Sequence, residues 1–327
     1  MTEIDALVVQ PILPDQMAAL DRTYRLHRYD SAPDKAELLR GVGDRIRAVV
    51  TTGGRGFTAE LLARLPALEI VASSGVGTDT IAVDACKARG VAVTNTPDVL
   101  NDDVADLGIG LVIAAMREMP KGHDYVRSGD WGRQGMMGFT TTLTGKTLGI
   151  VGLGRIGTEV ANRATALKMR VAYTGRRRQP VDFDYYPSVE DLARAADVLV
   201  LTCPGGPATR GLIGAAELSA LGPKSWLVNL ARGSVVDEPA LIAALESGGI
   251  RGAALDVYAS EPNPDPRLTR LPNVVLYPHH SSGSIETRTR MSQMVVDNLA
   301  AWFGGRPLLS PLFAIETPAF DIRELQR

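Results

Sequence analysis

Apolar and polar positions alternate in a regular way along most of the chain. Short apolar runs bounded by glycine or polar residues predict buried strands, whereas apolar residues three or four apart predict amphipathic helices. By this pattern strands are expected at residues 7–9, 25–29, 48–51, 70–72, 91–93, 148–151, 170–173, 197–202, 226–229, 252–257 and 273–276. Helices are expected at residues 15–20, 34–40, 58–65, 98–119, 215–221, 239–247 and 287–303, with another after residue 154. Such alternation is typical of doubly wound parallel sheets in an α/β protein.

The longest predicted helix, residues 98–119, has an unusual composition. It is apolar on nearly every side between residues 107 and 116, which indicates burial on more than one face, between domains or against a second subunit. Residues 121–144 are polar and rich in glycine, yet they also carry the large apolar residues Trp131, Met136, Met137 and Phe139. A long excursion with apolar side chains predicts an arm that contacts another molecule.

Composition limits the possible classes of protein. The 327 residues suffice for two domains, and a net charge of −2 argues against a general nucleic-acid or membrane surface. The apolar stretch at residues 107–116 is too short to span a bilayer, and residues 1–5 do not resemble a secretion signal. The two cysteines form no metal-binding motif, so no metal is expected and a cytoplasmic location is predicted.

A glycine motif follows the predicted strand at residues 148–151. Gly152 permits a tight turn, Gly154 allows a pyrophosphate to approach the backbone, and Gly157 lets the next helix pack closely on the strand. The helix N-terminus then offers free N–H groups to the phosphates. The pattern favours dinucleotide binding, although a plain tight turn between strand and helix is the alternative.

The end of the next strand discriminates between dinucleotides. An NAD site usually has a carboxylate there, which bonds the ribose 2′-hydroxyl. Here the strand at residues 170–173 is followed by Gly175, Arg176, Arg177 and Arg178. Guanidinium groups bind a 2′-phosphate, so NADP(H) is predicted over NAD(H). A solvated basic loop is the alternative.

Residues suited to keto acid reduction follow three predicted strands. Arg232 can bind a carboxylate and polarise a carbonyl, a histidine can donate a proton near neutral pH, and Glu261 can orient that histidine. His279 and His280 both follow the last strand. Surface ion pairing of Arg232, a turn role for Glu261 and simple packing of the histidines remain alternatives. Two glycine-bearing loops, residues 51–56 and 73–79, follow earlier strands and are either carboxylate-binding nests or simple turns.

Five segments carry a resemblance to a known family. Residues 94–100 (TNTPDVL), 149–157 (GIVGLGRIG), 229–233 (NLARG), 256–262 (DVYASEP) and 278–279 (PH) occur in the order typical of D-isomer-specific 2-hydroxyacid dehydrogenases. The chain resembles this family over nearly its whole length, and it is most similar to the NADPH-using glyoxylate, hydroxypyruvate and hydroxyphenylpyruvate reductases. One departure is His280-Ser281-Ser282, where the family usually has a small apolar residue and then glycine.

The resemblance implies roles for individual residues. Arg232, Glu261 and His279 would be catalytic, with His279 rather than His280 delivering the proton. Val76, Gly77, Arg232 and His279 would bind the substrate. The implied cofactor-binding residues are Gly152, Gly154, Arg155, Ile156, Gly157, Gly175, Arg176, Arg177, Cys203, Pro204, Thr209, Leu230, Ala231, Asp256, Ser281 and Ser282. Among these, Asp256 would face the nicotinamide end, and Cys203 would be a lining residue and not a nucleophile.

The resemblance also implies an architecture and an activity. A Rossmann-type cofactor domain, residues 98–287, would be inserted in a flavodoxin-like substrate domain formed by residues 1–97 and 288–327. The expected enzyme is a homodimeric, NADPH-dependent reductase that converts small 2-keto acids of the glyoxylate and hydroxypyruvate type to D-2-hydroxy acids. The alternatives are a hydroxyphenylpyruvate-type reductase and a non-enzymatic, dinucleotide-sensing corepressor or scaffold, which would require partner-binding surfaces or tails.

Overall fold

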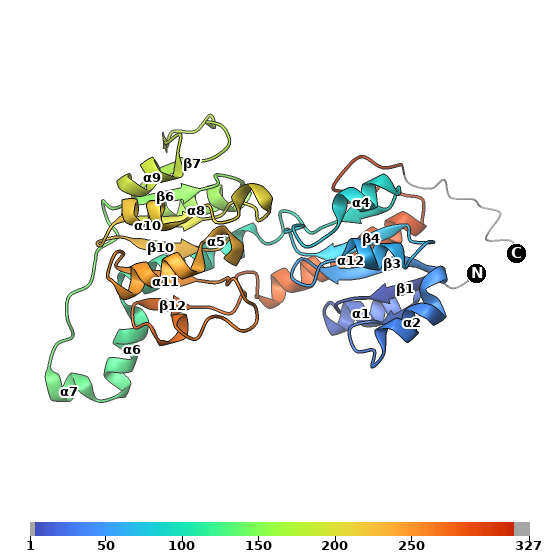
Figure 1. The fold of residues 1–327 in the computed structure, drawn as a ribbon, viewed down its shortest axis with the longest axis horizontal. Helices are drawn as coiled ribbons and strands as arrows, with labels where there is room; N and C mark the ends of the chain where they lie inside the picture. The colour runs from blue at the N-terminus through green and yellow to red at the C-terminus, as the bar shows by residue number, and fades with distance from the viewer. Residues whose placement is uncertain (1–3, 317–327) are drawn as a thin grey trace, which may run out of the picture. The chain divides into compact units, whose positions relative to one another are not determined.

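The computed structural model describes residues 4–316. The chain forms two compact units, one made of the residues up to Leu100 and from Ser284 onward, the other of Asn101–Gly283 (Figure 1). The sequence had suggested divisions after residues 97 and 287. The scaffold alternative would require partner-binding surfaces or tails, and the C-terminal stretch after Pro318 lies outside the described residues.

The first unit contains a five-stranded parallel sheet. Its strands are β1 (Ile4–Val8), β2 (Tyr24–Arg28), β3 (Ile46–Thr52), β4 (Ile70–Ser74) and β5 (Ala92–Thr94), in the order β2-β1-β3-β4-β5. This is the flavodoxin-like order expected for a doubly wound sheet. The helices are α1 (Pro14–Asp21), α2 (Lys35–Val42), α3 (Ala59–Ala63), α4 (Val83–Ala88) and α12 (Ile285–Phe303), with a 3-10 turn at Gly43–Arg45.

The C-terminal helix α12 completes the core of this first unit. Val295, Leu299 and Trp302 are buried in one cluster with side chains of β1, β3 and β4. Ser284 caps the helix, because its hydroxyl accepts a hydrogen bond from the Thr287 backbone N–H at 3.1 Å. The chain therefore returns to the first sheet after it has built the second.

The second unit contains a seven-stranded parallel sheet. Its strands are β6 (Thr147–Val151), β7 (Arg170–Thr174), β8 (Asp184–Tyr185), β9 (Val198–Leu201), β10 (Trp226–Asn229), β11 (Gly252–Leu255) and β12 (Val274–Leu276). The order β12-β11-β10-β9-β6-β7-β8 is the Rossmann order extended by one strand. The sequence had predicted six strands here, and the additional strand β8 has only two residues and no apolar run.

Helices cover the second sheet and position its loops. They are α5 (Asn101–Met116), α8 (Arg155–Ala166), α9 (Val189–Ala195), α10 (Ala215–Leu221) and α11 (Glu238–Glu246), with 3-10 turns at Pro207–Thr209, Gly233–Val235 and Leu268–Arg270. Asp237 caps α11, since its carboxylate accepts the Ala240 N–H at 3.1 Å. No helix among residues 4–316 combines the length and hydropathy needed to cross a bilayer.

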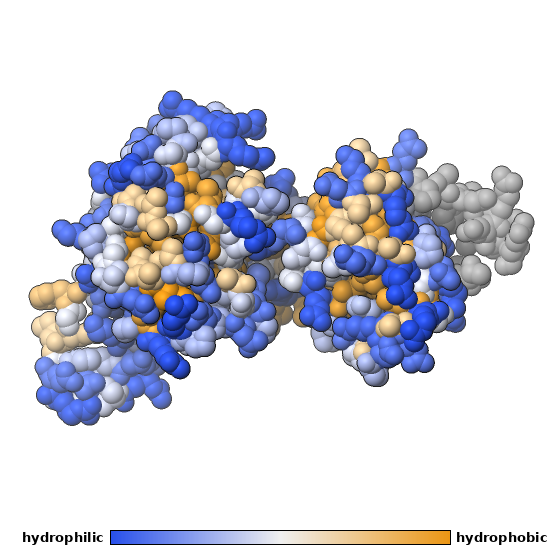
Figure 2. Space-filling model, in the orientation of Figure 1, coloured by the Kyte–Doolittle hydropathy of each residue, from blue (hydrophilic) through white to orange (hydrophobic). Residues whose placement is uncertain are grey.

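The prediction of one helix over residues 98–119 was wrong at both ends. Asp98 has a left-handed φ of 68° and the helix begins only at Asn101, whereas Glu118, with a φ of 49°, separates α5 from the next helix. The segment predicted to form an arm, residues 121–144, contains most of α6 (Met119–Arg127) and all of α7 (Asp130–Gln134). Figure 2 shows apolar side chains beside α7, and in this arm, residues 119–139, the exposed fractions reach 64% at Trp131, 80% at Met136 and 91% at Phe139.

Candidate active site

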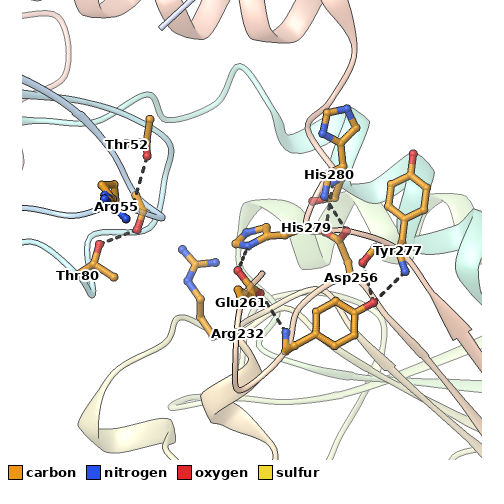
Figure 3. Close-up of polar contacts among 12 residues, drawn as sticks. Thr52, Arg55, Thr80, Arg232, Asp256, Glu261, Tyr277, His279 and His280 are labelled. Carbon is orange, nitrogen blue, oxygen red and sulfur yellow. Dashed lines mark hydrogen bonds and ion pairs between the residues drawn. The ribbon is translucent and has the colours of Figure 1, made fainter. Parts of the chain in front are cut away.

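A histidine and a glutamate form a close pair at the carboxyl edge of the second sheet. His279 follows β12 and Glu261 lies in the loop after β11; His279 Nδ1 is 2.6 Å from Glu261 Oε2 (Figure 3). The side chains of both residues are partly exposed, at 37% and 32%. A carboxylate at Nδ1 fixes the orientation of the ring and leaves Nε2 free for proton transfer.

The environment of Glu261 keeps it ionised. Burial alone would raise the pKa of this carboxyl group. Three effects lower it: the hydrogen bond from His279, the hydrogen bond from the Tyr258 backbone N–H at 3.0 Å from Oε1, and the positive charge of Arg232. Together they outweigh burial, so the pKa of Glu261 lies below its ordinary value. A negatively charged Glu261 therefore faces the imidazole at neutral pH.

Arg232 belongs to the same edge of the sheet. It follows β10, its Nη1 donates to the Ala231 carbonyl at 2.8 Å, and Figure 3 shows its guanidinium on the side of Glu261 and His279. Asn229 shapes this loop by accepting from Ala231 N and donating to the Arg232 carbonyl, both at 3.0 Å. The structure thus brings together the three residues predicted to be catalytic.

Two further residues in this region were not found from the sequence. Asn229 is one, and the other is Tyr258, whose hydroxyl accepts from Tyr277 N at 3.1 Å and lies 2.9 Å from the Tyr277 carbonyl oxygen. Burial raises the pKa of Tyr258 to about 12, so the hydroxyl keeps its proton. The link between the loops of Glu261 and His279 depends on tertiary pairing, and no local sequence pattern signals it.

His280 differs from its neighbour in its surroundings. It is exposed, its ring centroid is 6.5 Å from that of Tyr277, and in Figure 3 the ring points away from Glu261. The contact with Glu261 therefore distinguishes His279 from His280. The Ser281 N–H lies 3.2 Å from a carboxylate oxygen of Asp256, so a fully buried acid bonds the backbone of this turn.

A mainly apolar pocket adjoins the His279 and Glu261 pair. Its volume is about 310 Å³ and its lining includes Tyr258, Pro262 and Leu276 together with the two paired residues. Since Leu276 is 38% exposed, the pocket presents apolar surface to solvent. Its size and lining suit an apolar group next to His279.

The glycine motif has the shape required to hold a dinucleotide. Gly152 has a φ of 100°, and a Cβ there would lie 2.8 Å from the Cys203 backbone. A Cβ on Gly157 would lie 2.4 Å from the Gly152 carbonyl oxygen, whereas Gly154 faces open space. The helix α8 begins at Arg155 and no side chain caps it, so its first N–H groups are available to an anion and the residues fit a bound pyrophosphate.

The other residues expected near the cofactor follow neighbouring strands of the same sheet. Cys203 is buried, which raises the pKa of its thiol to about 11, so the thiol is protonated and a poor nucleophile. The Thr209 hydroxyl donates to the Pro204 carbonyl at 2.7 Å and closes that loop. Leu230 and Ala231 are buried directly after β10.

The predicted phosphate-binding arginines lie after β7. Arg176 and Arg177 are exposed, and Gly175 precedes them at half-buried depth. Neither arginine forms an ion pair with a described acidic residue. Two unpaired guanidinium groups at the end of the second strand of a Rossmann sheet suit a 2′-phosphate.

The predicted substrate-binding residues Val76 and Gly77 belong to the first unit. They follow β4, and Asn95 Nδ2 donates to the Val76 carbonyl at 3.0 Å. A Cβ on Gly53 would lie 2.7 Å from the Gly77 carbonyl oxygen, and the Thr80 hydroxyl donates to the Gly53 carbonyl at 2.6 Å. Figure 3 shows Thr80 and Thr52 beside this loop, which is therefore closely packed and well defined.

Comparisons with known proteins identify the family. Residues 109–281 match the model of the D-isomer specific 2-hydroxyacid dehydrogenase NAD binding domain. The chain is 45% identical over 313 residues to a glyoxylate/hydroxypyruvate reductase A of Arabidopsis thaliana, covering 95% of this chain and all of that protein. A hydroxyphenylpyruvate reductase of Plectranthus scutellarioides is equally similar, at 45% identity and with the same coverage.

A solved structure extends this similarity to three dimensions. The NADPH-dependent glyoxylate/hydroxypyruvate reductase of Sinorhizobium meliloti, determined with NADP and malonate, is 40% identical. It superposes with a TM-score of 0.88 and covers 95% of this chain and 97% of that one. The chain belongs to the D-isomer specific 2-hydroxyacid dehydrogenase family. It is an oxidoreductase with a domain that binds a nicotinamide cofactor, and the predicted fold and family are confirmed.

Among the described residues, no group of three or more potential ligands could hold a metal ion.

Proposed function

We propose that this protein is an NADPH-dependent reductase of small 2-keto acids, of the glyoxylate and hydroxypyruvate type, that forms D-2-hydroxy acids. The observation that carries the proposal is the His279 and Glu261 pair, 2.6 Å apart, with Arg232 on the same edge of the sheet. This is the set of groups required for keto acid reduction: a cation for the carboxylate and carbonyl, and an oriented proton donor. The identities of the two similar plant reductases support the same substrate class.

Substrate binding and proton transfer are assigned to different residues. Arg232 binds the substrate carboxylate and stabilises the negative charge that develops on the keto oxygen. His279 donates a proton to that oxygen from Nε2, because Nδ1 is engaged by Glu261. A bound reduced nicotinamide supplies the hydride. Val76 and Gly77 are proposed to bind the carboxylate through their backbone N–H groups.

The test is a substrate panel with both reduced cofactors. Glyoxylate, hydroxypyruvate, pyruvate and 4-hydroxyphenylpyruvate are assayed by the loss of nicotinamide absorbance, with His279→Ala as the background control. We expect kcat/KM to be highest for glyoxylate or hydroxypyruvate with NADPH. An absence of turnover with all four acids would reject the proposal.

A hydroxyphenylpyruvate-type reductase is the second candidate. The apolar pocket of about 310 Å³ beside His279 favours it, as does the similarity to the Plectranthus enzyme. In the same panel, a kcat/KM for 4-hydroxyphenylpyruvate above that for hydroxypyruvate would select this candidate. No observation in residues 4–316 favours the scaffold alternative over an enzyme.

The preference for NADPH is proposed to depend on Arg176 and Arg177. Both are exposed after β7, where a 2′-phosphate would lie. Replacing both by serine should raise the KM for NADPH at least about 100-fold, since charge-assisted hydrogen bonds contribute about 1.5–3 kcal/mol each, while the KM for NADH changes little. Arg178→Ser is the matched control. Equal KM changes for both cofactors would contradict the assignment.

The assembly proposed is a homodimer formed through the cofactor-binding unit. The exposed apolar residues of the arm support it, because side chains of this size seldom remain in water. A cytoplasmic location remains a prediction from composition.

A further inference from the structure

One buried carboxylate holds the whole turn that carries His279. Asp256 follows β11 and its side chain is inaccessible to solvent. Its backbone carbonyl accepts the His279 N–H at 2.7 Å, and its carboxylate accepts the His280 N–H at 2.8 Å and the Ser281 N–H at 3.2 Å. Three consecutive backbone amides thus donate to a single residue, as Figure 3 shows in part.

The turn needs such support because His279 has an uncommon backbone conformation. Its φ is 49°, in the left-handed region that residues other than glycine seldom occupy unless their surroundings impose it. The bonds to His280 and Ser281 lie directly after this residue and fix the chain on its C-terminal side. Without them the peptide could relax, and the imidazole would move away from Glu261.

The geometry points to Asp256 as a positioning residue that sets the direction of the His279 imidazole by bonding the backbone of the turn with both carboxylate oxygens. Asp256 acts through His279 and is not itself required to contact the substrate. The inference rests on the proposed function, in which His279 is the proton donor. It differs from the role implied by the family resemblance, in which Asp256 faces the nicotinamide.

The two roles predict different kinetics for Asp256→Asn. The amide keeps the shape of the side chain, but its NH₂ group is a donor. It therefore cannot accept the hydrogen bond of one of the two backbone N–H groups, and that bond is lost. A positioning role predicts that kcat falls about 30- to 100-fold, since a displacement of about 1 Å can have this effect. The dissociation constant of NADPH, measured by nicotinamide fluorescence without substrate, should stay within about threefold. A cofactor-contact role predicts instead that NADPH binding weakens as much as kcat falls, and that result would overturn the inference.

A spectroscopic measurement tests the geometry without turnover. In the unaltered protein the Nδ1 proton of His279, bonded to Glu261, should give a downfield resonance protected from exchange with water. In Asp256→Asn this resonance should broaden or disappear. Its persistence unchanged would overturn the inference even if activity were low. If the unaltered protein reduces no keto acid, the proposed function fails, and the resonance alone decides the role of Asp256.

A matched control separates positioning from general destabilisation. Asp197 also accepts a backbone amide with its carboxylate, from Thr147 at 2.8 Å, but at the start of β6 and away from the turn. Asp197→Asn should leave the His279 resonance and kcat unchanged. If Asp256→Asn does not fold, Asp256→Ser, with one hydroxyl acceptor, is measured in its place. Failure of both to fold would show that Asp256 is a structural residue only and would overturn the inference.

Discussion

The two carboxylate oxygens of Glu261 have different partners. One accepts the Tyr258 backbone N–H at 3.0 Å, and the other faces His279 Nδ1 at 2.6 Å. The hydrogen bond from the Tyr258 backbone fixes the orientation of the carboxylate, so its other oxygen stays directed at the imidazole of His279. Because the pKa of Glu261 is lowered, this charge persists in moderately acidic solution.

Replacing Glu261 by glutamine removes this charge and keeps the length of the side chain. In the proposed function, reduction needs the protonated imidazole of His279, and in this variant the protonated form lacks its carboxylate partner. The direction of the shift follows from this loss of charge: the alkaline limb of the profile of kcat/KM against pH should move to lower pH. At neutral pH kcat/KM should fall about 100-fold, the lower end of the range typical for general acid catalysis.

The measurement is kcat/KM for hydroxypyruvate across the pH range in which the protein stays folded. Glu217→Gln is the control, since Glu217 also accepts a backbone N–H, from Gly214 at 2.9 Å, but at the start of α10. An alkaline limb that stays in place in Glu261→Gln would show that Glu261 does not support the proton donor.

At the scale of elements, the loops after β10 and β11 pack with almost no space between them. A Cβ on Gly233 would lie 1.9 Å from the backbone carbonyl of Tyr258. Neither backbone can yield easily, because Tyr258 N is bonded to Glu261 and Gly233 lies in a 3-10 turn. The glycine next to Arg232 therefore sets how closely Arg232 and Glu261 approach.

Gly233→Ala should accordingly damage both the fold and the site. We expect a loss of about 1–3 kcal/mol in the free energy of unfolding, as for other overpacked positions, and a larger relative loss in kcat/KM. Urea unfolding and steady-state kinetics measure the two effects. The control is Gly41→Ala in α2, where no atom lies within 4 Å of the new Cβ and where alanine should stabilise the helix by up to about 1 kcal/mol. A Gly233→Ala protein of normal stability and activity would disprove the close packing.

The sequence predicted most strands but missed several short elements for clear reasons. The strands were accessible because buried parallel strands are apolar runs, such as residues 148–151. Strand β8 has two residues and forms only because β7 lies beside it. Helix α4 has six residues and no side-chain cap. Helix α9 does have a cap, Ser188, whose hydroxyl accepts the Asp191 N–H, so the sequence does contain a signal for its start.

The site was predictable to the extent that it depends on strand ends. Arg232, Glu261 and His279 each follow a parallel strand, and such ends share one edge of the sheet. The choice of His279 over His280 came from the family motif, and the contact with Glu261 now gives it a physical reason. The bonds of Tyr258 and Asn229 could not be predicted, because they join residues whose proximity exists only after folding.

At the scale of the whole molecule, most exposed large apolar side chains of the described residues lie in the arm. Its exposed apolar side chains, which include Trp131, Met136 and Phe139, gather at α6, α7 and the following loop. The contacts of these residues within one chain are sparse, whereas α5, which precedes them, is largely buried against α8 and the sheet. An isologous dimer would bury the same patch twice, so each substitution in it acts at two places.

Replacing Met136 and Phe139 together by serine should therefore dissociate the proposed homodimer. Each side chain contributes about 1.5–3 kcal/mol when fully buried, and the dimer contains two copies of each, so dimer affinity should fall at least about 100-fold. Light scattering after size-exclusion chromatography at micromolar concentration measures the mass directly. Ile285→Ser is the control, because Ile285 is 81% exposed and lies on α12 of the other unit. A monomeric mass for the unaltered protein, or equal dissociation by the control, would show that the arm does not join two copies.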